Sequence, residues 1–221
     1  MQTDHVGRFL NPDGGYLDTE GNPLTGCSAF EGITAMQHEG AFNAFGQMLP
    51  IVKPARILEI GTASGGLCLY LRRKLNEIGL EQSPIKTFDI FETGTHSVLK
   101  NEPGIEMIYD NIFSQDYLSL ANPQLIDSFI QQPGTTLVLC DGGNKIQEFK
   151  LVSPMLKSGD IIMAHDYSPN LEFFKQHIMN KIWAWMEISD QDVESAVKDN
   201  NLEPFMAEEF SKVVWLCSRK K

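Results

Sequence analysis

The 221-residue chain lacks the hydrophobic segments that would place it in a membrane or send it across one. It has no run of about 18 consecutive apolar residues, which a transmembrane helix needs. Its first residues, Met1 to His5, have neither the basic start nor the apolar stretch of a secretory leader. From these absences we expect a soluble, cytoplasmic protein with no membrane partner.

Cysteine is also scarce, and its spacing excludes two classes of stabilised fold. The four cysteines are Cys27, Cys68, Cys140 and Cys217, and no two of them are close in sequence. Structural zinc motifs pair their ligands a few residues apart, and disulfide frameworks are typical of short secreted chains. We therefore expect reduced thiols, with Cys68 and Cys140 buried inside apolar elements.

Positive charge is the third deficiency. Eighteen Lys and Arg residues face 29 Asp and Glu residues, which gives a formal net charge of −11. The short basic groups at residues 72–74 and 219–221 do not form a stripe. Such a chain repels phosphate backbones, so we expect no nucleic-acid partner and favour a small-molecule ligand.

The composition predicts one globular unit with an irregular arm. With 42% hydrophobic and 21% charged residues, the chain can form one sizeable α/β core and is too short for two full domains. Residues 1–28 are rich in Gly, Asn, Asp and Pro and show no sustained hydrophobic period, so they are expected to form an irregular N-terminal arm. Residues 29–221 are expected to form a single domain.

Hydrophobic periodicity within that domain alternates between the patterns of strands and helices. Apolar strands are predicted at residues 56–61, 85–90, 105–109, 136–141 and 160–165. Helices are predicted at residues 29–49, 66–78, 122–131 and 145–156, with a polar helical segment near residue 96, a helical stretch at 173–186 and an acidic helix opening at 189–192. Two closing strands, at 205–210 and 212–217, are expected to be joined by a two-residue turn. This order predicts a Rossmann-like, doubly wound α/β fold with a seven-stranded sheet and a C-terminal antiparallel hairpin strand.

Polar residues follow the predicted strands at their carboxyl ends. They are Glu59, Asp89, Asp110, Asn111, Asp141, His165 and Asp166. Because parallel strands bring their carboxyl ends to one edge of a sheet, we expect these side chains to converge there, where α/β sheets bind ligands.

A small-residue turn joins the first of these strands to its helix. The turn reads Gly61-Thr62-Ala63-Ser64-Gly65-Gly66, which is neither the dinucleotide pattern G-x-G-x-x-G nor a nucleoside-triphosphate loop with its Lys-Ser/Thr pair. Gly61 permits a tight turn, and Gly65 and Gly66 allow close approach of a ligand to the backbone and helix start. The pattern predicts binding of an adenosine-containing cofactor across Thr62 and Ser64. Asp89 follows Gly61 by 28 residues, at a distance suited to holding ribose hydroxyls.

The turn resembles the first motif of class I S-adenosylmethionine (SAM)-dependent methyltransferases, E/D-x-G-x-x-x-G. The resemblance implies that SAM is the cofactor, that Glu59 lies near its methionine part, and that Asp110 and Asn111 contact its adenine. Asn111 could equally serve only as a turn or helix-capping residue.

Residues 139–145 and 156–167 further resemble the metal-dependent small-molecule O-methyltransferases, which include cephalosporin-hydroxylase-like, macrolide-sugar and caffeoyl-CoA enzymes. The resemblance spans residues 29–167 and resumes in the C-terminal strands. It implies a Mg²⁺ site at Asp141 and Asp166, completed by Asn144 or His165, beside a small-molecule hydroxyl acceptor with two adjacent oxygens.

Two positions depart from that family's pattern. Asn144 stands where the cephalosporin-hydroxylase-like branch has a histidine, and His165-Asp166 stands where an acidic pair is found. An asparagine cannot accept a proton at neutral pH, so His165 or Lys145 becomes the base, or the metal acidifies the acceptor unaided. Lys145, at a helix start, is expected to face solvent.

Two other functions stay open from the sequence. A nicotinamide-dependent oxidoreductase is disfavoured by the glycine spacing and by the missing Tyr-x-x-x-Lys pattern. A non-catalytic SAM-binding protein is compatible with the asparagine at position 144. The sequence leaves the oligomeric state undetermined, and a homo-oligomer is compatible with it.

Overall fold

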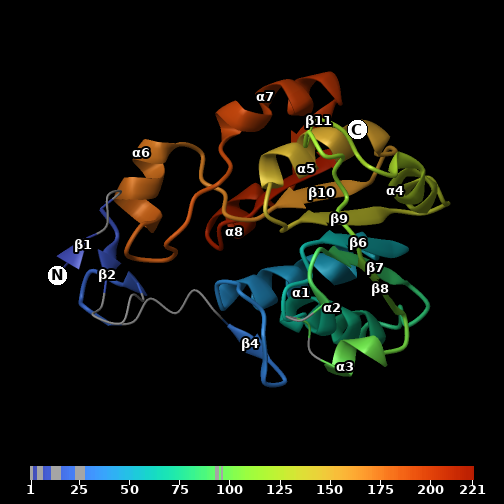
Figure 1. Ribbon diagram of the computed structural model, residues 1–221, viewed down its shortest axis with the longest axis horizontal. Helices are drawn as coiled ribbons and strands as arrows, with labels where there is room; N and C mark the ends of the chain where they lie inside the picture. The colour runs from blue at the N-terminus through green and yellow to red at the C-terminus, as the bar shows by residue number, and fades with distance from the viewer. Residues whose placement is uncertain (1, 4–6, 11–15, 23–27, 93–94, 96) are drawn as a thin grey trace.

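A seven-stranded sheet forms the centre of the computed structural model, which describes residues 2–3, 7–10, 16–22, 28–92, 95 and 97–221. The strands lie in the order β11-β12-β10-β9-β6-β7-β8 (Figure 1). Their bounds are β6 Arg56–Ile60, β7 Ile85–Asp89, β8 Ile105–Tyr109, β9 Thr136–Cys140, β10 Ile161–Ala164, β11 Leu202–Pro204 and β12 Leu216–Lys220. The predicted Rossmann-like, doubly wound fold is confirmed.

The sheet has one reversal of strand order and one reversal of strand direction. The chain enters at β6, moves outward through β7 and β8, and then returns to β9 on the other side of β6, with parallel pairing throughout. β12 then inserts antiparallel to β10, and β11 pairs antiparallel to β12 at the sheet edge. The first reversal opens a crevice between the carboxyl ends of β6 and β9, which is where doubly wound sheets bind ligands.

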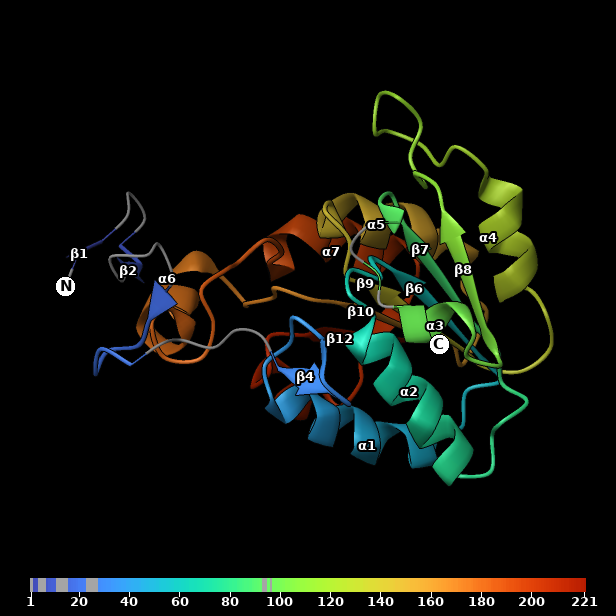
Figure 2. The same ribbon diagram turned by 60° about the horizontal axis from the view of Figure 1, so that its bottom comes forward.

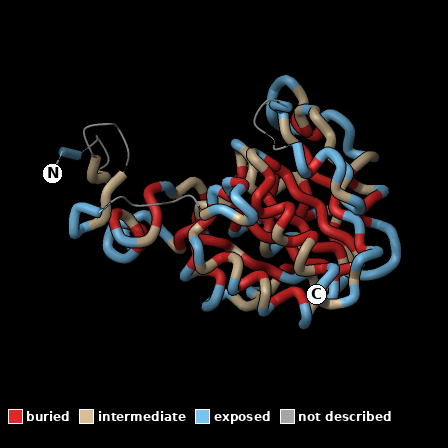
Figure 3. Tube along the Cα trace, turned by 90° about the horizontal axis from the view of Figure 1, so that it is seen from below, coloured by how far each residue is buried: buried red, intermediate tan, exposed pale blue. Residues whose placement is uncertain are grey.

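Helices cover both faces of this sheet (Figure 2). One face carries α1 Gly40–Val52, α2 Gly66–Glu77 and α8 Ala207–Ser211, and the other carries α4 Pro123–Ile130, α5 Lys145–Val152 and α7 Asp190–Asp199. Neighbouring residues of a strand face opposite layers, so Ile57 packs with the first helices and Leu58 with the second. All five residues of β6 are buried, as in central strands covered on both faces. Figure 3 shows this buried interior.

The predicted helix at residues 29–49 is wrong at its beginning. Strands β4 Ala29–Phe30 and β5 Ile33–Thr34 form a hairpin, and α1 begins only at Gly40 and runs through Pro50 to Val52. The hairpin turn, Glu31-Gly32, has φ values of 49° and 79°. Such left-handed pairs form two-residue hairpin turns, and this local turn overrides the weak helical period.

The terminal strands are present, but they lie elsewhere than predicted. The segment expected to hold a two-residue turn forms α8, while β11 lies before it and β12 begins after it. Phe210 explains the helix, because it is fully buried with its ring centroid 5.2 Å from that of Phe45 on α1. A hairpin at residues 205–217 would not provide that contact with the core.

Other elements differ only in extent. The helix expected at 145–156 is α5 followed by a 3-10 turn, η2 Ser153–Met155. The stretch expected at 173–186 is shorter, with α6 Leu171–Phe173 and a π-helical turn, η3 Phe174–Ile178. Near residue 96, which is outside the described residues, the helix is α3 Ser97–Lys100. Among the described residues, no helix combines the length and the apolar character needed to cross a membrane.

The described part of the N-terminal arm is more regular than expected. It contains three two-residue strands, β1 Gln2–Thr3, β2 Phe9–Leu10 and β3 Tyr16–Leu17, which pair antiparallel. The arm lies beside α6, at a distance from the main sheet (Figure 1). The Asn180 side chain holds it there, donating to the Gly7 carbonyl and accepting from the Phe9 amide, both at 3.0 Å. The boundary at residue 28 between arm and domain stays a prediction.

Candidate active site

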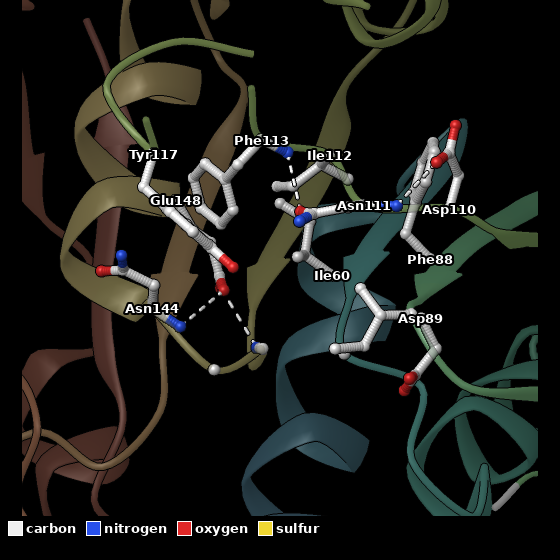
Figure 4. Close-up of a pocket in the computed structure, with 14 residues that line it drawn as sticks. Ile60, Phe88, Asp89, Asp110, Asn111, Ile112, Phe113, Tyr117, Asn144 and Glu148 are labelled. Carbon is white, nitrogen blue, oxygen red and sulfur yellow. Dashed lines mark hydrogen bonds between the residues drawn. The ribbon is translucent and has the colours of Figure 1, made fainter. Parts of the chain in front are cut away.

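Two adjoining cavities lie at the carboxyl edge of the sheet. The first cavity, of about 330 Å³, lies over the ends of β6, β7 and β8 (Figure 4). The second cavity, of about 470 Å³, lies over the ends of β6, β9 and β10. Both are lined by Gly61, Asp89, Ile90, Gly142 and Gly143. An elongated ligand can therefore span the strand-order reversal.

The glycine turn after β6 borders both cavities through Gly61. Gly61 has φ +94°, and a Cβ there would be 2.2 Å from the Asp141 carbonyl oxygen. Only glycine allows this approach of the β6 turn to the end of β9. Gly65, at φ +91°, begins α2, and a Cβ on Gly66 would be 2.5 Å from the Ile33 carbonyl oxygen. The predicted tight turn is present, although Ser64, Gly65 and Gly66 support it from outside the two cavity linings.

Asp89 lies at the end of β7 and contributes to both cavities. Its Oδ2 accepts a hydrogen bond of 2.7 Å from the Ala63 amide, and its Oδ1 accepts one of 3.0 Å from the Phe91 amide. Each oxygen retains a lone pair for a ligand. The carboxylate thus ties the glycine turn to β7 while facing the cavity.

Asp110 and Asn111 line the first cavity beyond the end of β8. The Asp110 side chain accepts from the Asn111 amide at 2.8 Å, and the Asn111 side chain accepts from the Phe113 amide at 3.0 Å. Asn111 is therefore a turn residue, and the turn presents it to the cavity. The turn role is confirmed, and the contact of Asn111 with adenine stays a prediction.

Glu148 on α5 supports the opposite wall of the first cavity, and the sequence interpretation missed it (Figure 4). It accepts from the Gly142 and Asn144 amides, both at 3.1 Å, which fixes the loop after β9. Burial raises the pKa of its carboxyl to about 7. Asn144 begins α5, with its side chain accepting from the Gln147 amide at 3.4 Å.

Glu59 is buried at the base of the second cavity, with 1% of its surface exposed. Thr87 donates a hydrogen bond of 2.5 Å to it, and Thr62 lies 2.6 Å from the same hydroxyl. Burial raises the pKa of Glu59 to about 8, and the negative charges of Asp141 and Asp89 contribute in the same direction. The raised pKa favours the neutral, protonated form of the Glu59 side chain near pH 7.

Asp141 and His165 form a hydrogen-bonded pair at the ends of β9 and β10. His165 Nδ1 lies 3.0 Å from Asp141 Oδ1. Burial opposes protonation, but the charges of Asp141 and Asp166 outweigh it and raise the pKa of His165. The other ring nitrogen, Nε2, is buried and has no hydrogen-bond partner among the described residues. The ring packs against Trp183 and Trp215, with centroid distances of 5.1 and 4.9 Å.

Gln37, another residue that the sequence interpretation missed, fixes the far side of Asp141. Its Nε2 donates to Asp141 Oδ2 at 2.6 Å, and its Oε1 accepts from Trp215 Nε1 at 2.8 Å. Gln37 is fully buried in the loop between β5 and α1. The carboxylate is thus held by one side chain on each oxygen.

Lys145 is buried, so the expectation that it faces solvent is wrong. Its ammonium lies 3.0 Å from Asp166 Oδ2 and 2.9 Å from Glu187 Oε2, and it donates to the Gly142 carbonyl at 2.7 Å. Burial disfavours its charge, but the carboxylates of Asp166, Asp141 and Glu187 prevail and raise the pKa of Lys145.

Asp166 joins this cluster to the wall of the second cavity. Its Oδ1 accepts from Trp183 Nε1 at 2.6 Å, and its backbone has φ +58°, in the left-handed region. Burial disfavours the carboxylate, yet His165 and Lys145 hold its pKa below the ordinary range. The carboxylate at this left-handed position contacts the Lys145 ammonium.

The arrangement of these groups does not fit the predicted Mg²⁺ site. Asp166 is neutralised by the Lys145 ammonium, and Asp141, although each of its oxygens retains a lone pair, is already paired with Gln37 and His165. Asn144 caps α5 and lines the first cavity, whereas the two aspartates meet at the second. In the part of the chain that the structure describes, no three His, Cys, Asp or Glu side chains form a group able to hold a metal ion.

The chain resembles known proteins in its structure and not in its sequence. No protein-family model matches the chain, and no curated protein sequence matches it. Among solved structures, CmcI with SAH aligns with a TM-score of 0.60 at 14% identity, over 87% of this chain and 82% of that one. CmcI with Mg and SAM gives 0.59 at 13% identity, over 88% and 76%. The SAH-bound methyltransferase PaMTH1 from Podospora anserina gives 0.51 at 14% identity, over 82% and 78%. The chain shares their fold.

Proposed function

We propose that the chain is a SAM-dependent methyltransferase that methylates a hydroxyl group of a small molecule. The observation that carries the proposal is the pair of adjoining cavities at the strand-order reversal of a sheet with an inserted antiparallel strand. The structural neighbours support it, because structures with this fold hold SAH or SAM. The net charge of −11 favours a small acceptor over a nucleic acid.

In this proposal the adenosine part of SAM occupies the first cavity. Asp89 accepts hydrogen bonds from the two ribose hydroxyls through its remaining lone pairs, and Asp110 and Asn111 border the adenine. The methionine part passes Gly61 and Thr62 toward Glu59 in the second cavity. The cationic amino group of SAM would then meet a carboxyl group that is neutral in the free protein.

Methyl transfer needs alignment, exclusion of water and a base for the acceptor proton. Trp183 and Trp185 provide an apolar wall for the second cavity. If His165 Nδ1 donates to Asp141, the buried Nε2 holds the lone pair, and it accepts the acceptor proton once the acceptor hydroxyl reaches it from the second cavity, which His165 lines. The acceptor oxygen forms its bond to the methyl carbon as the carbon–sulfur bond of SAM breaks, leaving SAH and a protonated His165. Mg²⁺ has no part in these proposed reaction steps, because the residues present do not form a Mg²⁺ site.

The two alternatives have less support. The inserted β12 strand and the G-x-x-x-G-G turn disfavour a nicotinamide-dependent oxidoreductase. A non-catalytic SAM-binding protein would need neither a His165–Asp141 pair nor a second cavity. Methyl transfer from labelled SAM to a cognate acceptor separates that alternative from the enzyme.

Calorimetric titration with SAH tests the cofactor assignment. We expect Asp89→Ala to bind SAH about 5- to 150-fold more weakly, because loss of a hydrogen-bonded acceptor costs about 1–3 kcal/mol. Asp127→Ala, on α4 and outside the lining of both cavities, is the matched control and should bind like the wild type. Unchanged affinity in Asp89→Ala, or tighter binding of NAD than of SAH, would contradict the assignment. Circular dichroism of each variant establishes that it is folded.

A further inference from the structure

The groups around Lys145 are those of a cation-binding site. The cation that they surround is the ammonium group of Lys145 itself. Lys145, Asp166 and Glu187 come from three separate segments, the start of α5, the end of β10 and the segment before α7. The Gly142 carbonyl adds an oxygen from the loop after β9. All three ammonium protons therefore have oxygen partners, at 2.7 to 3.0 Å.

The burial of the Lys145 ammonium requires compensation by neighbouring groups. Lys145 is 6% exposed, whereas a lysine on a helix surface normally keeps its ammonium in water. A buried cation is retained only where anions compensate its desolvation. Here the compensating oxygens are carboxylates and a carbonyl, which are also the groups that Mg²⁺ prefers.

We propose that the Lys145 ammonium takes the place of a divalent cation at the second cavity, so that the site is assembled and neutralised without a metal ion. Lys145 acts here as a positioning residue, because its three protons are committed to protein oxygens. It holds Asp166, and Asp166 in turn holds the Trp183 indole over the cavity. The role of Lys145 in assembling the site follows from its contacts alone. The importance of Lys145 for methyl transfer rests on the proposed function.

The proposal changes the class of acceptor expected from the sequence. A chelated metal would select two adjacent oxygens, as in a catechol or a vicinal diol. With a lysine in the cluster and a single unpartnered nitrogen on His165, one reacting hydroxyl is sufficient. The tryptophan wall favours an aromatic or apolar body for that acceptor.

Thermal unfolding in the presence of MgCl₂ or MnCl₂ tests the cation assignment without an acceptor. The wild type should show the same melting temperature in either salt as in NaCl of equal ionic strength. Lys145→Gln should lose about 6 °C or more without divalent ions, because it leaves buried carboxylates unpaired, and should regain part of that loss with Mg²⁺ or Mn²⁺. Lys150→Gln, on the same helix, is the control and should respond like the wild type.

A saturable rise for the wild type, or no divalent-ion response in folded Lys145→Gln, would overturn the proposal. Where that variant does not fold, electron paramagnetic resonance of Mn²⁺ mixed with the wild type decides the question. The free-ion signal should stay undiminished, and a stoichiometric loss of signal would contradict us. Calorimetry with SAH in EDTA keeps the two proposals apart, because failure to bind SAH contradicts the methyltransferase and leaves the ion measurements valid.

Discussion

Replacement of Glu59 by glutamine tests the electrostatics of the site through protein stability. Glu59 has an ordinary pKa of 4.5 and a folded-state pKa of about 8, chiefly because of burial. Between these values the folded chain holds a proton that the unfolded chain has released. The unfolding free energy therefore falls by about 1.4 kcal/mol per pH unit across this window. The stabilisation is fully present below pH 4.5 and is lost as the pH rises through about 8.

Over the roughly 3.5 pH units between the two values, the accumulated loss is on the order of 4 to 5 kcal/mol. Glutamine has the same shape, stays neutral at every pH and can still accept the hydrogen bond from Thr87. Glu59→Gln should therefore remove this slope and be more stable than the wild type by several kcal/mol near pH 8. Near pH 5 the two proteins should be about equally stable.

Urea unfolding, followed by circular dichroism between about pH 5 and pH 8, measures the difference directly. Glu194→Gln, at an exposed position on α7, provides the control and should leave the wild-type slope unchanged. Parallel stability curves for Glu59→Gln and the wild type would refute the reasoning. Calorimetry in two buffers adds a second measurement, since SAH binding near pH 7 should release a proton from Glu59 that the variant cannot release.

Three further predictions concern the frame of the site. Gly61→Ala should lose more than about 2 kcal/mol of stability and bind no SAH. The control Gly79→Ala, also at positive φ but with open space around it, should lose only about 1–2 kcal/mol. Urea unfolding measures the stability of both variants, and calorimetry measures their SAH binding. Gln37→Leu should cost about 2–4 kcal/mol in urea unfolding, because it leaves a buried carboxylate oxygen and a buried indole N–H unpartnered. Hydrogen exchange at residues 7–10 and 16–22 should slow when SAH binds, and Tyr16→Ala should weaken this protection by removing the ring contact of 5.0 Å with Trp185 at the second cavity. Equal exchange with and without SAH would count against a role of the arm.

Most of the sheet could be predicted from the sequence because its central strands are apolar on both faces and end in polar residues. β6 and β9 are buried along their whole length, and apart from Arg56 and Glu59 in β6 and Thr136 in β9 they consist of apolar residues. The errors fall where local and tertiary preferences compete. The hairpin at β4 and β5 depends on two left-handed residues, and α8 depends on the burial of Phe210 against another helix. Neither condition leaves a periodic signal in the chain.

The site residues at the strand ends could be predicted from the sequence. The contacts between side chains of distant segments could not. Asp89, Asp141 and His165 follow strands, so the fold alone brings them to the cavities. Lys145 was misplaced because its partner Glu187 lies 42 residues away, in a segment without regular structure. Gln37 lies in a loop that the sequence pattern assigned to a helix. A polar residue in an apolar stretch was the available signal, and it does not identify a partner.

The pairing of charges in the second cavity connects the fold to the chemistry. Asp141 lies 3.0 Å from His165 and Asp166 lies 3.0 Å from Lys145, while His165 is also 3.6 Å from Asp166, so each aspartate has a basic side chain as its nearest partner. Such preorganised pairs need little rearrangement when a proton moves, because the compensating charge is already in place. The His165–Asp141 pair can accept a proton while the Lys145–Asp166 pair keeps its charge and holds the tryptophan wall. In the proposed reaction, the group that accepts the proton and the group that maintains the cavity thus lie side by side at one edge of the sheet.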